Sequence, residues 1–195
     1  RSLVQVTLGV ARDLSTEPHS VTFPLPEPIE IAGERRTLMS YRHHCHDSSL
    51  APAGKSIVQV SYDSDLDWWQ PHLADPARYE SEKKHVADVI ISALDRRFPG
   101  LAGQVEMVDV ATPVAFHRYT GNWKGSIEGW LISTKTVQMT FGGGMPKTLP
   151  GLDRFYMAGQ WVEPGGGLPN VALSGRNAVQ FICDRDHRRF VTSEA

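Results

Sequence analysis

The sequence predicts an α+β fold, in which an antiparallel or mixed sheet with one long helix precedes a strand, a glycine-rich loop and a second helix. Three observations support this prediction. Alternating apolar segments fill the first sixty residues, apolar residues recur at helical spacing over residues 76–98, and glycine and proline become dense after residue 121. Strands and helices therefore occupy separate blocks, which disfavours a repeated β–α–β series.

The first block is predicted to be a β-meander. Residues 3–10 begin the chain as the interior of a strand, which indicates a truncated chain, and residues 56–62 alternate cleanly. Further strand candidates are residues 21–23, 29–31 and 37–41. The proline-rich residues 24–28 cannot lie in a central strand, because each proline removes a hydrogen-bond donor from the ladder.

A long helix is predicted over residues 76–98. Asp75 and Pro76 are typical of an N-cap and a first helical position, and Pro99 with Gly100 would end the helix. Trp68 and Trp69 precede the helix and are expected to pack in the core. Residues 105–110 form a further strand candidate, and the boundary between the two parts of the chain is expected near residues 109–113.

Composition narrows the function classes. The chain has 195 residues, of which 20 are basic and 22 acidic, so its formal net charge is −2 and nucleic acid is not an expected partner. The two cysteines, Cys45 and Cys183, are too few for a disulfide scaffold and favour a reduced, cytoplasmic protein. No apolar run reaches the roughly 18–20 residues that a membrane-spanning helix needs.

Several motifs fail when their chemistry is examined. Residues 43–46 (His-His-Cys-His) would need further metal ligands from elsewhere, and no CxxC or HExxH pattern supplies them, so no metal is expected. Residues 53–56 resemble the end of a phosphate-binding loop, but they precede a strand, and Ser49 stands where the loop needs glycine. Ser174 lacks the glycine two residues earlier that a nucleophile elbow needs. No catalytic residue is identified.

Residues 155–170 have the pattern most typical of a ligand site. An apolar strand is predicted to end at Gly159, a glycine-rich loop follows, and a helix begins near Asn170 and continues through residues 171–181. Three consecutive glycines let the backbone approach a ligand closely, and a helix N-terminus offers N–H groups and partial positive charge. Leu168 precedes a proline and is expected to be extended. A plain strand–helix connection stays open as the alternative.

The same segment resembles the C-terminal flavin-binding segment of the phytoene desaturase and carotenoid isomerase family, within the wider amine-oxidase-like group of FAD enzymes. The resembling motifs are residues 149–152, 155–159, 164–169 and 172–178. A weaker resemblance to that family's substrate domain covers residues 51–55, 67–69, 82–83, 97–100 and 111–113. It implies that residues 1–112 are a portion of a substrate-binding domain, and that residues 113–195 hold connecting strands and the FAD-binding segment.

The resemblance implies that FAD is the cofactor and that the glycine-rich loop faces it. The implied cofactor-binding residues are Gly159, Gln160, Gly166, Gly167, Leu168, Pro169 and Asn170. The helix after the loop would direct its positive end at the N1–C2=O side of the flavin, so that the protein tunes the cofactor. Two features depart from the family: Gln160 replaces a common Asp, and the N-terminal Gly-x-Gly-x-x-Gly fingerprint is absent. The FAD site in this chain is therefore expected to be incomplete.

The implied parent protein is an FAD-dependent oxidoreductase that desaturates, saturates or isomerises carbon–carbon bonds of a lipophilic polyene or isoprenoid, and the fragment alone is expected to be inactive. Peripheral membrane contact is left open because such substrates dissolve in lipid, and so is the oligomeric state. Two alternatives stay open. One is an amine or amino-acid oxidase with an aromatic cage from Tyr119, Trp123, Trp130 or Trp161, and the other is a non-catalytic module that binds a hydrophobic ligand or a protein.

Overall fold

The structure, a computed structural model, describes residues 2–130, 132–134, 136–137, 145–163 and 165–192. The chain divides into two compact units, Arg1–Ile127 and Glu128–Ala195. The predicted functional boundary lies earlier, between residues 112 and 113. Because compactness does not define a substrate or a cofactor domain, that assignment stays a prediction.

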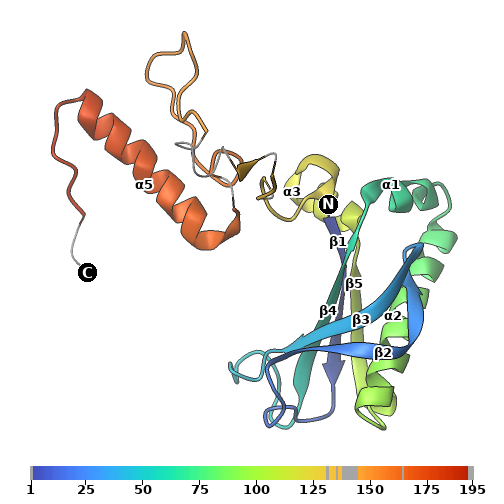
Figure 1. Ribbon diagram of the computed structural model, residues 1–195. Coiled ribbons are helices and arrows are strands. Elements are labelled where there is room, and N and C mark those ends of the chain that lie inside the picture. The colour runs from blue at the N-terminus through green and yellow to red at the C-terminus, as the bar shows by residue number, and fades with distance from the viewer. Residues whose placement is uncertain (1, 131, 135, 138–144, 164, 193–195) are drawn as a thin grey trace. The chain divides into compact units, whose positions relative to one another are not determined.

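A five-stranded antiparallel sheet forms the centre of the first unit (Figure 1). Its strands are β1 (Ser2–Val10), β2 (Ser20–Ile31), β3 (Glu34–His43), β4 (Ser56–Ser64) and β5 (Val105–Ala111), in the spatial order β2-β3-β4-β1-β5. β2, β3 and β4 form a meander as predicted, but β1 pairs with β4 and β5 rather than with β2, so the prediction of a meander is wrong for the first strand. The sheet is antiparallel throughout. β2 contains the proline-rich residues and is an edge strand, where missing donors face solvent. The register of its pairing with β3 shifts between Pro24 and Ile29.

The long helix α2 (Pro76–Arg97) packs on one face of the sheet (Figure 1). Asp75 caps it, since its carboxylate accepts hydrogen bonds from the backbone N–H groups of Ala77 and Arg78. The face that α2 presents to the sheet is buried, as helical periodicity predicted, and so are the alternate residues of β1. The core side chains of these two elements are Val4, Val6, Leu8, Val10, Val86, Ala87, Ile90, Ala93 and Leu94. Burial of this apolar surface is the main force that holds the unit together.

Short elements complete the first unit. α1 (Leu66–Trp69) and the 3-10 turn η1 (Gln70–Ala74) lead into α2, and Trp69 is fully buried with its indole N–H bonded to the Ser64 hydroxyl. The prediction that Trp69 packs in the core is confirmed. Another 3-10 turn, η2 (Ala102–Gln104), leads into β5.

Residues 113–120 form a helix, α3 (Pro113–Thr120), so the prediction of connecting strands from residue 113 is wrong there. Pro113 occupies the first turn and Gly121 the left-handed C-cap at φ +67°, which is the usual proline-first, glycine-last pattern of a helix. The sequence carried this signal. A 3-10 turn, η3 (Trp123–Gly125), follows α3.

The second unit is built around α5 (Gly167–Arg185). The helix is longer than residues 171–181 predicted, because it begins directly at the glycine turn. The strand predicted to end at Gly159 is not formed among the described residues; Thr148 and Tyr156 make an isolated antiparallel bridge instead. A strand needs a neighbour to bind its N–H and C=O groups, and the described residues here supply one bridge only. No helix among the described residues is long and apolar enough to cross a membrane.

Candidate functional site

The backbone of the glycine-rich loop is held in conformations that favour glycine. Gly159, Gly165, Gly166 and Gly167 have φ angles of +115°, +106°, +61° and +81°. Residues with a Cβ rarely adopt these angles, so a side chain at any of the four positions would strain the backbone. Gly165 and Gly166 precede α5 and Gly167 is its first residue, so three consecutive residues with positive φ form the turn into the helix.

Space differs along this turn. A Cβ placed on Gly166 would lie 2.9 Å from Oε2 of Glu128, and one on Gly165 would lie 2.8 Å from Nδ2 of Asn170. A Cβ on Gly159 would meet no atom of the described residues within 4 Å. Gly165 and Gly166 therefore allow close packing inside the turn, whereas the Cα of Gly159 faces open space that an incoming group could fill.

In the part of the chain that the structure describes, the N-cap position of α5 makes no side-chain cap hydrogen bond. Its N-cap residue is Gly166, which has no side chain to offer, and Leu168 in the first turn is 86% exposed. The first N–H groups of a helix have no partner within the helix, and the helix dipole places partial positive charge there. Leu168 lies inside α5, so the prediction that it is extended is wrong. The first turn tolerates the following proline because no N–H is needed there.

A carboxylate already lies close to this helix start. The short distance from Gly166 to Glu128 places an acidic oxygen against the turn that precedes α5. Helix dipoles favour negative charge at this end, and in this structure the Glu128 carboxylate lies beside the turn and supplies it. Sequence reasoning missed Glu128, because nothing in its local pattern ties it to a loop nearly forty residues later.

Two contacts fix Gly159 relative to α5. Its backbone N–H donates to the hydroxyl of Ser174, at 3.0 Å, and Ser174 is fully buried. Its carbonyl accepts from the N–H groups of Val162 and Glu163, both at 3.1 Å, which closes the loop on itself. Ser174 thus joins the predicted residue Gly159 to the helix. The sequence analysis considered Ser174 only as a nucleophile, and rejected it.

A buried ion pair braces the same loop. The ammonium group of Lys147 lies 2.7 Å from Oε2 of Glu163 and 2.6 Å from the carbonyl oxygen of Val162. The Lys147 side chain is 8% exposed. Charged side chains are seldom buried without a partner. The partners of Lys147 are Val162 and Glu163, which lie in the loop between Gly159 and α5.

Aromatic packing holds the other side of the loop. The indole N–H of Trp130 donates to the carbonyl of Trp161 at 2.9 Å, and the two rings meet edge to face with centroids 5.8 Å apart. A Cβ on Gly129 would lie only 1.9 Å from the carbonyl oxygen of Gln160, so the two backbones touch. Trp130 and Trp161 therefore pack against each other, while Tyr119 and Trp123 belong to the first unit.

Four histidines gather where β3 ends. The ring centroid of His19 lies 5.5 Å from that of His43 and 5.2 Å from that of His46, and His44 lies 5.9 Å from His46. His43 is buried, and its Nε2 bonds the Glu17 carbonyl while its Nδ1 accepts a backbone N–H. Within the part of the chain that the structure describes, no group of three His, Cys, Asp or Glu side chains is arranged to hold a metal ion.

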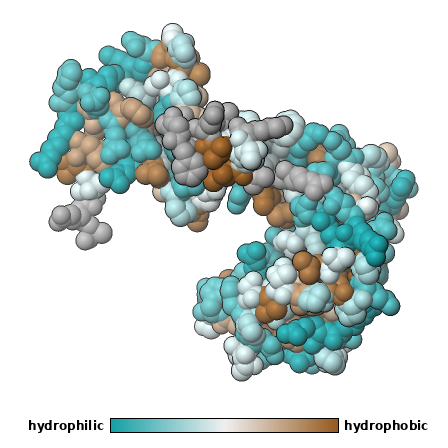
Figure 2. Space-filling view, in the orientation of Figure 1, coloured by the Kyte–Doolittle hydropathy of each residue, from teal (hydrophilic) through white to brown (hydrophobic). Residues whose placement is uncertain are grey.

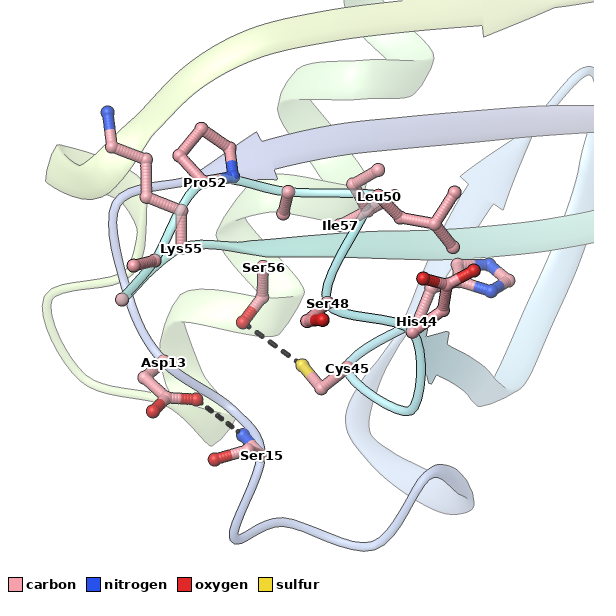
Figure 3. Close-up of a pocket in the computed structure, with 14 residues that line it drawn as sticks. Asp13, Ser15, His44, Cys45, Ser48, Leu50, Pro52, Lys55, Ser56 and Ile57 are labelled. Atoms are coloured by element: carbon pink, nitrogen blue, oxygen red, sulfur yellow. Dashed lines mark hydrogen bonds between the residues drawn. The ribbon is translucent and has the colours of Figure 1, made fainter.

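A pocket of about 210 Å³ opens beside this cluster (Figure 3). Ser56 lies in its wall, where the hydroxyl donates to the Arg12 carbonyl and accepts from the Cys45 thiol. The ammonium group of Lys55 binds the carboxylate of Glu106. The Lys55 ammonium group and the Ser56 hydroxyl are therefore both bonded to other residues of the chain. The segment also leads into β4 rather than into a helix, which agrees with the rejection of a phosphate-binding loop here. Both cysteines are free thiols.

Comparison with known proteins places this geometry in context. No family model matches the chain. Prolycopene isomerase of Daucus carota is 35% identical over 130 residues, which are 66% of this chain and 20% of that protein. The chain is a homologue of carotenoid isomerases and desaturases. The chain also resembles the chloroplastic prolycopene isomerase of Arabidopsis thaliana. The two are 33% identical over 130 residues, which are 66% of this chain and 21% of that protein.

A bacterial enzyme matches a larger part of the chain. The 4,4'-diapophytoene desaturase of Methylomonas sp. is 28% identical over 149 residues, which are 74% of this chain and 27% of that protein. The resemblance inferred from the motifs is therefore confirmed. The chain spans about a fifth of the length of the first relatives.

Proposed function

We propose that the chain is part of an FAD-dependent oxidoreductase that isomerises, desaturates or saturates carbon–carbon bonds of a lipophilic polyene, and that its second unit forms one wall of the flavin site. The observation that carries the proposal is the glycine turn at the uncapped start of α5, in a chain 35% identical to a protein named prolycopene isomerase. A turn of this kind lets backbone approach a flat, electron-rich ring.

The proposed contacts use backbone more than side chains. Gly167, Leu168 and Asn170 carry N–H groups in the first turn of α5, whereas Pro169 has none. These donors and the helix dipole favour negative charge on the bound ring, whereas the Glu128 carboxylate beside Gly166 opposes it. Gly159 offers an open Cα face, and Gln160 follows it. FAD, when bound, supplies the hydride chemistry, and the residues here hold the ring and bias its charge.

Exposed apolar surface on α5 supports the same proposal. Figure 2 shows brown, apolar patches among the hydrophilic atoms of this unit. The exposed apolar side chains of the helix are Leu168, Val171, Leu173, Val179 and Phe181. A helix with apolar side chains on faces that its own unit leaves exposed is typical of a helix that packs within a larger domain or beside a lipophilic ligand.

The alternatives receive less support. The relatives carry names of carotenoid enzymes, which does not favour amine oxidation. Of the four aromatic residues suggested for a cage, Trp130 and Trp161 are packed against each other. A non-catalytic module gives no reason for the open space beside the Cα of Gly159, whereas close packing already accounts for Gly165 and Gly166.

The visible absorption spectrum tests the proposal. The full-length gene product and residues 1–195 are purified side by side, and each is mixed with FAD. We expect bound flavin in the full-length protein, followed by conversion of a polyene substrate, and neither in residues 1–195. Absence of flavin from both proteins after FAD is added would overturn the proposal.

A matched pair of alanine variants locates the flavin. In the full-length protein, Gly167→Ala places a side chain at φ +81°, in the proposed contact, whereas Gly54→Ala imposes a similar strain at φ +76° in the first unit, where the methyl group meets no described atom within 4 Å. We expect about tenfold weaker FAD binding for Gly167→Ala, since backbone strain of about 1 kcal/mol or more would distort the turn. Gly54→Ala should bind FAD as the wild type does. Equal affinities would place the flavin elsewhere.

A further inference from the structure

We infer that Ser174 is a positioning residue for the flavin site: its buried hydroxyl holds the Gly159 peptide against α5, so that the loop and the helix start face the ring together. The inference rests on the proposed function. Ser174 lies two turns inside α5, is fully buried, and accepts the Gly159 N–H at 3.0 Å. It belongs to the helix and Gly159 to the loop, so this one bond joins the two parts of the proposed site.

The bond also decides how Gly159 can meet a ligand. Its N–H is taken by Ser174, and its carbonyl accepts from Val162 and Glu163. A ligand therefore finds neither backbone dipole of Gly159 free and meets its bare Cα, beside which no described residue lies within 4 Å of the position that a Cβ would take. Gly159 thus supplies close approach, and the hydrogen-bond donors come from the first turn of α5.

Loss of the hydroxyl would release the loop. In Ser174→Ala the Gly159 N–H loses its acceptor, and a backbone donor left without a partner is costly enough to shift the local conformation. The fold of α5 itself should persist, because alanine is the better helix former. Ser174→Thr keeps a hydroxyl at the same position and is expected to restore the bond.

The first measurement needs no cofactor. Amide hydrogen exchange of Gly159 is compared in the full-length wild type, Ser174→Ala and Ser174→Thr, with Ser92→Ala as a control that removes an exposed helical hydroxyl from α2. We expect about tenfold faster exchange for Ser174→Ala alone, since a protecting hydrogen bond is lost. Unchanged exchange in Ser174→Ala would show that the bond is absent, and would overturn the inference whatever the flavin does.

The second measurement uses FAD on the same four proteins. Ser174→Ala should bind FAD about tenfold more weakly, and at saturating FAD the visible band of the bound flavin should shift, because the loop has moved against the ring. Ser174→Thr and Ser92→Ala should match the wild type in affinity and spectrum. Wild-type affinity and spectrum in Ser174→Ala would overturn the positioning role while the flavin site stands. Absence of FAD binding in the wild type would instead overturn the proposed function, and with it this role.

Discussion

Lys147 and Glu163 form the least exposed ion pair among the described residues, with side chains 8% and 19% exposed. Burial of both partners makes the pair sensitive to removal of either one, because the remaining charge keeps its desolvation cost and loses its attraction. At exposed pairs water screens the charges and little is lost. The two situations can be compared within this chain.

We expect Lys147→Met to destabilise the loop between Gly159 and α5 by about 1–3 kcal/mol, since the Glu163 carboxylate and the Val162 carbonyl both lose their donor. Native-state hydrogen exchange of peptides from residues 145–163 would report the change. Lys84→Met is the matched control, because Lys84 and Asp88 are 75% and 56% exposed, and a change below about 0.5 kcal/mol is expected. Equal effects at the two sites would contradict this account.

The environment of His44 predicts a pH dependence for the stability of the first unit. Burial, followed by the neighbouring His46 and His19, lowers the pKa of His44 below its ordinary value of 6.5. Arg42 and His43 also face it and act in the same direction. The folded state then binds fewer protons than the unfolded chain, so its stability should fall as the pH drops below 6.5 towards the folded pKa, and should not depend on His44 above that range.

Urea unfolding measured at a series of pH values checks this expectation. His44→Gln removes the titrating group and should flatten the loss of stability below pH 6.5, in proportion to the share that His44 contributes. His85→Gln, at an exposed position of α2, controls for loss of an imidazole elsewhere. An identical pH profile for wild type and His44→Gln would show that the cluster does not couple protonation to folding.

At the scale of elements, the cap of α2 offers a clean test. Asp75→Ala removes the acceptor for the N–H groups of Ala77 and Arg78, and should cost about 1 kcal/mol in the free energy of unfolding. Asp75→Asn keeps an oxygen at the same place and should lose much less. Both variants are compared by urea denaturation followed by circular dichroism. If Asp75→Asn were as destabilised as Asp75→Ala, the carboxylate charge rather than the cap would be responsible.

Elements whose signals are local were predictable. Residues 76–97 carry a cap, a period and a stop within one segment, and β1 and β4 alternate over nine residues each, so each was found from its own sequence. α3 was missed although Pro113 and Gly121 bracket it, because its eight residues bury only Pro113 and show little period. The strand before Gly159 depended on a partner strand, which no local pattern can guarantee.

The candidate site was predictable in part for the same reason. The turn at residues 165–167 was predictable from its three consecutive glycines, because such a run is typical of backbone with positive φ. The residues that hold the turn and its loop in place were not predictable from the sequence. Ser174, Lys147 and Glu128 reach the loop from 15 or more residues away, and contacts of that kind arise from tertiary packing.

At the scale of the whole molecule, the core is unequally shared. Every member of the buried hydrophobic cluster lies between Val4 and Leu101, and Val162 is the one buried hydrophobic residue that the structure describes in the second unit. Apolar burial supplies most of the free energy of folding, so the two units should differ greatly in stability on their own.

We expect residues 1–127 to unfold cooperatively in urea, and residues 128–195 to show helical content without a cooperative transition. Circular dichroism and tryptophan fluorescence of the two separate polypeptides would show it. A cooperative transition in residues 128–195 would mean that α5 and its loop hold together without a larger core, and would weaken the proposal that they form part of a larger flavin domain.

The two edges of the sheet have opposite consequences for solubility. β2 carries three prolines and an irregular register along its edge, so an approaching strand finds a broken row of donors. β5 has no proline, and Met107 and Val108 on it are 73% and 48% exposed. In concentrated solution, copies of the separated first unit should therefore associate through β5 rather than through β2, where the ladder of donors is interrupted. The outer edge of β5 is then the place to introduce a lysine when crystals or spectra require a monodisperse sample.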